Sequence, residues 1–292
     1  MTFKNHIVVP TDFSEQSIIA LDQTYNLARA TGSDITLVHV LDATLMGSVL
    51  NLFSSSETQE ALLRTGVQTK LNEYAVEAFA KSGISIKSRI EKGKIYEEIV
   101  KVAEELSAAF IIMGTSGEST IKKKFIGSNA VRVINEAHCP VITIKGQKHR
   151  SGCKTIVLPL DLSRETKEKV GKCIEIAKFF GSAVKVISVI DSTDEFLINK
   201  MTRQMEQVKD FISSHQIEVT GEFIQGKHIA EEILTYSEKA QADLIIIMTQ
   251  QELEWTEYFI GTASQEIINT SEIPVCSIRP IERKNTMEFT IS

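Results

Sequence analysis

The chain contains 292 residues, of which 42% are hydrophobic and 24% are charged, and its formal net charge at pH 7 is −6. This composition predicts an ordinary soluble globular protein of about two domains. The acidic balance argues against general nucleic-acid binding, because a phosphate backbone requires a basic protein face. The longest uncharged window, 43–56, is too short and too rich in serine to cross a bilayer, which needs roughly 20 apolar residues. No basic-then-apolar signal segment opens the chain, so we expect a cytoplasmic protein without membrane contact.

The first part of the chain has a β-α-β pattern. Apolar residues from Ile7 to Val9 predict a buried strand that runs into the polar turn Pro10–Ser14. Ser14 is expected to cap a helix with apolar residues at helical spacing, and Gly32 is expected to end it. A second strand is expected at 35–40, where His39 is interpreted as a packed core or rim histidine.

Strands and helices continue to alternate after this unit. The expected elements are helix 59–81, strand 84–90, helix 96–107, strand 110–113, a helix after Gly127, and strand 141–144. This alternation predicts a parallel sheet that is covered by helices on both faces.

The whole pattern then repeats. Pro159 follows Pro10 by 149 residues, and Gly181 follows Gly32 by the same interval. The later parts match at 134 residues, as in Gly127 and Gly261. Further elements of the second copy are helices 194–215 and 229–240 and strands 217–224, 243–247 and 275–278. The repeat predicts two domains, 1–146 and 153–280, joined by a polar, glycine-bearing linker at 146–152.

The change of interval from 149 to 134 means that the first copy holds 15 extra residues, most simply placed at 43–64. Within this insertion Met46, Val49, Leu50 and Phe53 have helical spacing and form one apolar stripe. Two interpretations stay open: a helix that packs onto its own domain, and a lid or partner surface.

Cysteines do not form a metal or disulfide pattern. There is no CxxC pair and no histidine at metal-ligand spacing. We therefore interpret Cys139, Cys153, Cys173 and Cys276 as reduced, partly buried thiols, and we predict neither a metal site built from protein side chains nor a catalytic cysteine.

A glycine-bearing loop lies between the strand that ends at Met113 and the helix after Gly127. Glycine lets the backbone approach an anion closely, and free N–H groups at a helix start carry partial positive charge. Ser128 and Asn129 add side-chain donors at that start. The loop therefore predicts phosphate binding, although many glycine-rich loops are only turns.

Three segments together resemble the universal stress protein domain, in the subgroup that binds ATP. They are the turn Pro10–Ser14, the strand end His39-Val40, and the motif Gly114-x2-Gly117-x9-Gly127-Ser128. The resemblance covers nearly the whole chain, with one domain per repeat. It implies two flavodoxin-like, doubly wound α/β domains, each with a five-stranded parallel sheet in the order 3-2-1-4-5. That order brings Asp12 and Gly114 together at the topological switch point, where ligands of such sheets bind.

The resemblance also implies an ATP site, with Mg, in the first domain. Carried over by position, the backbone of Val40 contacts adenine, and Asp12 lies near the ribose or a phosphate-bound metal. The glycines line the ribose and phosphates. The expected nucleotide-binding residues are Pro10, Thr11, Asp12, Val40, Met113, Gly114, Gly117, Gly127, Ser128 and Asn129. Asp12 has an alternative interpretation as a turn residue at the helix start, and Lys122, Lys123 and Lys124 either screen the triphosphate or form a solvated loop.

The second repeat departs from this motif. Met248 stands at the place of Gly114 and Gln251 at the place of Gly117, whereas Gly261 and Asp161 remain. We expect the methionine to take space that a nucleotide needs, which would leave a degenerate second site. In the family the final strands of two domains can pair, so strands 141–144 and 275–278 are expected to form an internal pseudo-dimer. A further homodimer stays open.

Three functions are compatible with these patterns to different degrees. The first is an ATP-binding regulatory or stress-response module that acts on an unknown protein partner. The second is an adenylating or pyrophosphatase-type enzyme, which is disfavoured because no glycine/serine or histidine nucleotide motif follows the first strand. The third is an interaction scaffold without nucleotide. We find no developed catalytic apparatus, and slow ATP hydrolysis stays open.

Overall fold

The computed structural model describes residues 6–42, 56–115, 126–146, 152–161, 166–251, 258–259 and 261–280. Four predicted features lie outside these described residues: the apolar stripe 46–53, Gly117, Lys122–Lys124, and linker residues 147–151. Residues 6–146 are called the first half below, and residues 152–280 the second half.

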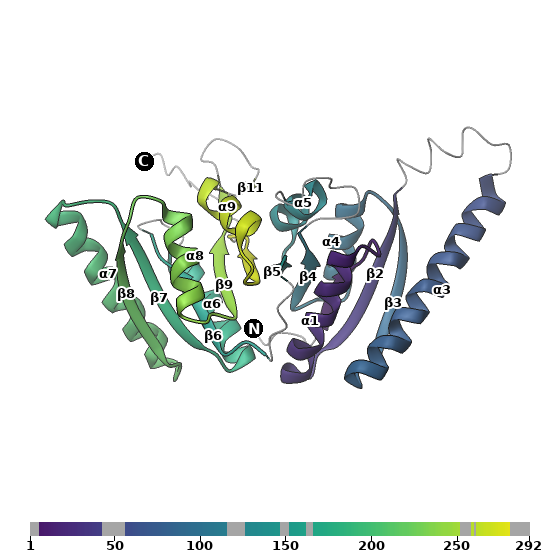
Figure 1. The fold of residues 1–292 in the computed structure, drawn as a ribbon, viewed down its shortest axis with the longest axis horizontal. Helices are drawn as coiled ribbons and strands as arrows, with labels where there is room; N and C mark the ends of the chain where they lie inside the picture. The colour runs from purple at the N-terminus through teal and green to yellow at the C-terminus, as the bar shows by residue number, and fades with distance from the viewer. Residues whose placement is uncertain are drawn as a thin grey trace, which may run out of the picture.

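Ten strands form one continuous sheet (Figure 1). In the first half the spatial order is β3 (Ile86–Gly93), β2 (Asp34–Asp42), β1 (His6–Pro10), β4 (Phe110–Gly114) and β5 (Val141–Ile144). The sheet continues with β12 (Val275–Ile278), β9 (Leu244–Met248), β6 (Thr155–Pro159), β7 (Ala183–Ile190) and β8 (Val219–Gln225). Each half therefore has the predicted strand order 3-2-1-4-5, which confirms the doubly wound α/β fold.

Helices cover both faces of the sheet. In the first half α1 (Glu15–Thr31) and α3 (Ser56–Ser82) pack on one face, and α4 (Ile95–Glu105) and α5 (Ser128–Glu136) on the other. The second half repeats this arrangement with α6 (Thr166–Phe180) and α7 (Glu195–Ser214) opposite α8 (Ile229–Lys239) and α9 (Thr262–Thr270). A short hairpin, β10 (Gln250–Gln251) and β11 (Tyr258–Phe259), precedes α9. No helix among the described residues is long and apolar enough to span a membrane.

The two halves meet at their last strands, as the resemblance implies. β5 and β12 pair antiparallel, with Val275 opposite Thr143 and Cys276 opposite Ile142, whereas the other strand pairs of this sheet are parallel. This pairing gives both strands a neighbour and so removes two exposed sheet edges. Each buried core cluster draws residues from both halves, which makes the molecule an internal pseudo-dimer.

Local signals fix the first helix as predicted. The Ser14 side chain accepts a hydrogen bond from the Ser17 backbone N–H at the start of α1. Gly32 ends the helix with φ 66°, a left-handed conformation that glycine adopts at low cost. The boundaries of other elements move by a few residues from those expected; for example, strand 84–90 is observed as β3 at 86–93.

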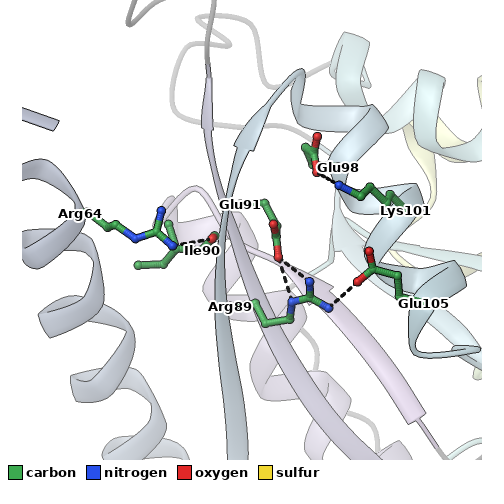
Figure 2. A network of polar contacts seen from close by, with 7 residues as sticks. All are labelled: Arg64, Arg89, Ile90, Glu91, Glu98, Lys101 and Glu105. Carbon is green, nitrogen blue, oxygen red and sulfur yellow. Dashed lines mark hydrogen bonds and ion pairs between the residues drawn. The ribbon is translucent and has the colours of Figure 1, made fainter. Parts of the chain in front are cut away.

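The edge strand β3 is covered by polar contacts from two helices (Figure 2). Arg89 on β3 donates to Glu91 on the same strand and to Glu105 on α4, at 2.8 and 2.9 Å. Arg64 on α3 donates to the Ile90 carbonyl at 3.4 Å. Charged groups along an edge strand discourage pairing with another chain, so this network protects one end of the sheet.

Candidate functional site

A cleft opens where β1 and β4 end side by side. β1 and β4 are paired neighbours, and the chain leaves them for α1 on one face and α5 on the other. A cavity of about 260 Å³ lies at this switch point. Nine of the ten predicted site residues line it: Pro10, Thr11, Asp12, Val40, Met113, Gly114, Gly127, Ser128 and Asn129. The tenth, Gly117, lies outside the described residues.

The β1–α1 turn is held by its own hydrogen bonds. The Thr11 backbone N–H donates to the Val38 carbonyl at 2.8 Å, and its hydroxyl lies 3.1 Å from that of Ser17. Asp12 Oδ1 accepts from the backbone N–H of Ser14 at 3.0 Å and from its hydroxyl at 2.5 Å. Asp12 therefore has the turn role that was considered for it, and its exposed carboxylate also borders the cleft.

Phe13 has φ 65°, a left-handed conformation that is unusual for a residue other than glycine. Its ring stacks on His39 at 4.7 Å and on Tyr74 of α3 at 5.8 Å between centroids, and the Lys70 ammonium lies 4.5 Å from the ring centroid. These contacts hold a strained turn in place. Nothing in the sequence indicated this conformation.

His39 is a packed rim residue that also borders the cleft. Its Nδ1 lies 2.8 Å from the Thr11 carbonyl, which assigns the proton to that nitrogen. Burial lowers the pKa of His39, and the bond to Thr11 offsets part of this effect. The ring is therefore neutral near pH 7 and fixes the backbone of the β1–α1 turn.

Gly114 is required by packing between α1 and β4. A Cβ atom at this position would lie 2.8 Å from Gln16 Cγ and 3.0 Å from the Gln16 carbonyl oxygen. The Gln16 side chain is itself fixed, because its Nε2 donates to the carbonyls of Ile144 and Lys145 at 2.8 and 3.0 Å. The missing side chain thus has a structural cause, in addition to the ligand contact predicted for this glycine.

The start of α5 presents backbone donors to the cleft. Gly127 is the N-cap residue without a side-chain capping bond, and the first turn carries no acidic residue. The Gly127 N–H donates to the Thr115 carbonyl at 2.6 Å, and the Ile126 N–H donates to Asn269 Oδ1 at 2.6 Å. Ser128 and Asn129 follow directly and line the cavity. A helix start of this kind attracts anions.

Asn269, which sequence reasoning missed, belongs to α9 of the second half. It lies 134 residues after Asn135 of α5, so the repeat interval marks the two asparagines as equivalent positions and could have drawn attention to Asn269. The two asparagines differ in their contacts, because Asn135 Oδ1 is buried without a hydrogen-bond partner in the described part of the chain. The second half thus supports the first cleft directly.

Two basic residues, one from each half, bind the C-terminal ends of α5 and α9 at the contact between the halves. Lys145, after β5, donates to the Asn269 carbonyl, and Arg279, after β12, donates to the Glu136 carbonyl at 3.0 Å. Each contact places a positive charge near the C-terminal end of a helix in the other half, where it is favourable. α5 and α9 are therefore coupled to the opposite half.

The second half has its own cleft at the ends of β6 and β9. Its cavity of about 400 Å³ is bordered by Asp161, Lys169, Met248 and the start of α9. Met248 is buried and belongs to the core cluster that also contains residues of α6. A cavity remains beside Met248, and the expectation that this methionine takes space that a nucleotide needs stays a prediction.

Neither a metal cluster nor a reactive thiol is found within the described ranges. These residues contain no group of three or more histidine, cysteine or acidic side chains that could hold a metal ion. All four cysteines are free thiols, and burial raises the pKa of Cys139 to about 12 and that of Cys276 well above its usual value. Such thiols stay protonated at neutral pH.

Fold and clefts define a tandem pair of doubly wound α/β domains with a crevice at each switch point. The sequence model of the universal stress protein family matches residues 4–145 and again residues 152–279. The chain therefore belongs to the universal stress protein family.

Individual relatives agree with this assignment. Universal stress proteins MJ0531 and MJ0577 of Methanocaldococcus jannaschii are 34% identical over 150 residues and 33% identical over 155 residues. These matches cover 49% and 48% of this chain and 82% and 93% of the relatives. The crystal structure of a universal stress protein from Archaeoglobus fulgidus DSM 4304 has a TM-score of 0.73 at 22% identity, covering 95% of this chain and 97% of that one. The fold likeness thus extends over both halves.

Proposed function

We propose that the cleft of the first half binds ATP with Mg, and that the protein is a nucleotide-dependent regulatory module in a stress response. The observation that carries this proposal is the convergence of two distant segments, the β1–α1 turn and the start of α5, on one cavity. Both segments belong to the motif that resembles the ATP-binding subgroup. The second half is proposed to lack a working nucleotide motif.

The chemistry of the cleft suits an adenine nucleotide. Val40, Ile95, Ile99 and Met113 line the cavity with apolar side chains that suit a base. The start of α5 supplies backbone N–H groups, together with the Ser128 hydroxyl and the Asn129 amide, for phosphate oxygens. The described lining contains no lysine or arginine, so within the described residues charge neutralisation would fall to a bound Mg ion. The Asp12 carboxylate, which borders the cleft, is the group proposed to bind this Mg ion.

A regulatory role fits better than a catalytic one. The described lining offers no nucleophile paired with a base, and the His39 Nδ1 proton is engaged by the Thr11 carbonyl. ATP occupancy would instead change the stability and shape of the cleft, and through Asn269 the contact with the second half. The partner that reads this change is an unidentified protein.

An interaction scaffold without nucleotide is the alternative function. It is favoured by α3, which exposes large apolar side chains such as Val76, 70% exposed, and Leu62, 68% exposed. Exposed apolar groups of this size often mark protein contacts. This alternative predicts no ATP binding.

Calorimetric titration of the nucleotide-free protein with Mg-ATP separates the two. We expect one site per chain, and a stabilisation of about 2.7 kcal/mol when free ATP is one hundred times Kd. Gly127→Val should abolish binding, because the side chain would hold the phosphate away. Gly127 has φ −67° and ψ 148°, which valine adopts, so the variant should fold.

Gly261→Val is the matched control, because Gly261 occupies the same N-cap position in the second half with φ −58° and ψ 154°. This variant should bind ATP like the wild type. Equal affinity of Gly127→Val and wild type would overturn the site. Absence of ATP binding by the wild type would favour the scaffold.

A further inference from the structure

We propose that the free edge of strand β8 is a pairing surface for a second copy of this chain, which binds through antiparallel β8–β8 contact about a two-fold axis. β8 forms the end of the ten-stranded sheet opposite β3 (Figure 1). The sheet already continues between the two halves by antiparallel pairing of β5 and β12. Pairing at β8 would extend the same sheet once more, and it does not depend on nucleotide binding in either half.

The backbone of β8 has one side without partners. The Val184 N–H donates to the Glu218 carbonyl at 2.8 Å, and the Gly226 N–H donates to the Ile190 carbonyl at 3.1 Å. These bonds identify the groups that face β7, because alternate residues of a strand point their N–H and C=O groups to the same side. The groups that face away from the sheet belong to Val219, Gly221, Phe223 and Gln225. Within the part of the chain that the structure describes, none of these outward groups has a hydrogen bond.

α7 packs on the face of β8. A Cβ atom at Gly221 would lie 2.7 Å from Lys209 Cδ and 2.8 Å from Met205 Sδ. A Cβ atom points out of the face of a strand, so these two α7 side chains lie over that face. The contacts with α7 therefore use the face of the strand and leave its outward N–H and C=O groups unpaired.

The opposite edge strand, β3, has the protection that β8 lacks. Its outward Ile90 carbonyl accepts from Arg64 of α3, whereas the equivalent carbonyl of Phe223 has no partner among the described residues (Figure 2). β3 carries four charged side chains and β8 carries one, Glu222. Equivalent positions hold Lys87, Glu91 and Lys92 in β3 and Thr220, Ile224 and Gln225 in β8. Charges on an edge strand discourage pairing, so β8 is the edge suited to it.

Charges at the two ends of β8 favour a second copy of this chain as the occupant. Glu218 precedes the strand, Lys227 and His228 follow it, and all three residues are exposed. In antiparallel self-pairing centred on Phe223, Glu218 of each copy lies opposite His228 of the other copy and beside its Lys227. Opposite charges across antiparallel strands stabilise the pair. A register centred on Glu222 would instead place two carboxylates opposite each other.

Sedimentation of the full chain over a range of concentrations tests this inference. We expect a reversible dimer that weakens as salt is added, because the charges at the strand ends are exposed. Hydrogen exchange of segment 218–227 should slow as the dimer forms, and protection of other segments only would overturn the inference. A chain that stays monomeric up to about 1 mM, the weak end of the affinity scale, would also overturn it and would favour an extended segment of another protein as the occupant.

A charge exchange separates β8 self-pairing from other dimers. Glu218→Lys and Lys227→Glu should each raise the dimer Kd about tenfold, because each turns attraction into repulsion twice in a symmetric pair. The double variant should return to near the wild-type Kd, since the two charges meet only between copies. Within one chain they lie at opposite ends of the strand, roughly 30 Å apart. Lys87→Glu, a charge reversal on β3, is the matched control and should dimerise like the wild type.

A proline substitution tests the backbone contact itself. Gln225→Pro removes one outward N–H group, which a free edge strand tolerates, and should also raise the dimer Kd. Lys92→Pro, at the equivalent position of β3, should leave the Kd unchanged. Unchanged Kd in folded Gln225→Pro, or no recovery in the double charge variant, would overturn the β8 pairing.

Discussion

Turns β1–α1 and β6–α6 occupy equivalent places in the two halves, yet their surroundings differ. In the first, the Thr11 and Ser17 hydroxyls lie 3.1 Å apart beside the neutral His39 ring. In the second, Leu160 borders the cavity together with the buried ammonium of Lys169. The contacts between the halves are more alike than the clefts. Lys145 and Arg279 each donate to a carbonyl near the C-terminal end of the helix in the opposite half. The repeated backbone thus supports two clefts of different polarity.

The largest effect is expected where the two halves share one core. Phe110 of β4 is fully buried, stacks on Phe180 of α6 and packs at a tilt against Phe179, with both centroid distances 5.4 Å. Phe110→Ala should lower the free energy of unfolding by about 3–5 kcal/mol in a single denaturant transition. Phe196→Ala is the control, because this ring is exposed on α7, and its effect should stay within about 0.5 kcal/mol. Separate transitions for the two halves would contradict the shared core.

Substitutions at Asn269 and Asn135 test whether these two equivalent asparagines contribute unequally to the contact between the halves. Asn269→Ala leaves the Ile126 N–H without its acceptor and should cost about 1–3 kcal/mol of stability. It should also weaken Mg-ATP binding several-fold, because the start of α5 loses a support. Asn135→Ala should cost less, since Asn135 Oδ1 has no hydrogen-bond partner among the described residues. Both quantities follow from chemical denaturation and calorimetry, and equal losses in the two variants would argue against the asymmetry.

A smaller, pH-dependent effect is expected at His39. Burial lowers its pKa below the ordinary value of 6.5, so below about pH 6.5 the unfolded chain binds a proton that the folded chain does not yet take up. This contribution to stability is present above pH 6.5 and is lost as the pH falls toward the folded pKa. His39→Gln should therefore flatten the fall in unfolding free energy between pH 7 and pH 5.

The equivalent position in the second half is Ser188, which does not titrate. His6→Gln is the comparison variant, because burial also lowers the pKa of His6 away from the cleft. It should flatten the same pH profile without changing Mg-ATP affinity. A wild-type pH profile in His39→Gln would contradict the assignment.

Much of the architecture could be predicted from the sequence alone. Alternating strands and helices restrict the topology to a few right-handed arrangements, and the repeat places both halves in the same one. Ser14 and Gly32 fix the ends of α1 through local hydrogen bonds and a local backbone angle. The glycine motif and the β1–α1 turn converge because the strand order makes β1 and β4 neighbours.

Only the tertiary structure decided what surrounds each cleft. A side chain at position 114 would collide with Gln16, and the Phe13 ring stacks on Tyr74. Asn269, from the other half, accepts a hydrogen bond from the Ile126 N–H. Met248 belongs to the buried core and also borders the second cavity, as does Lys169. Local patterns report periodicity and caps, which depend on neighbours along the chain. Contacts between side chains far apart in sequence depend on how each helix docks on the sheet, and that is set by packing of the complete core.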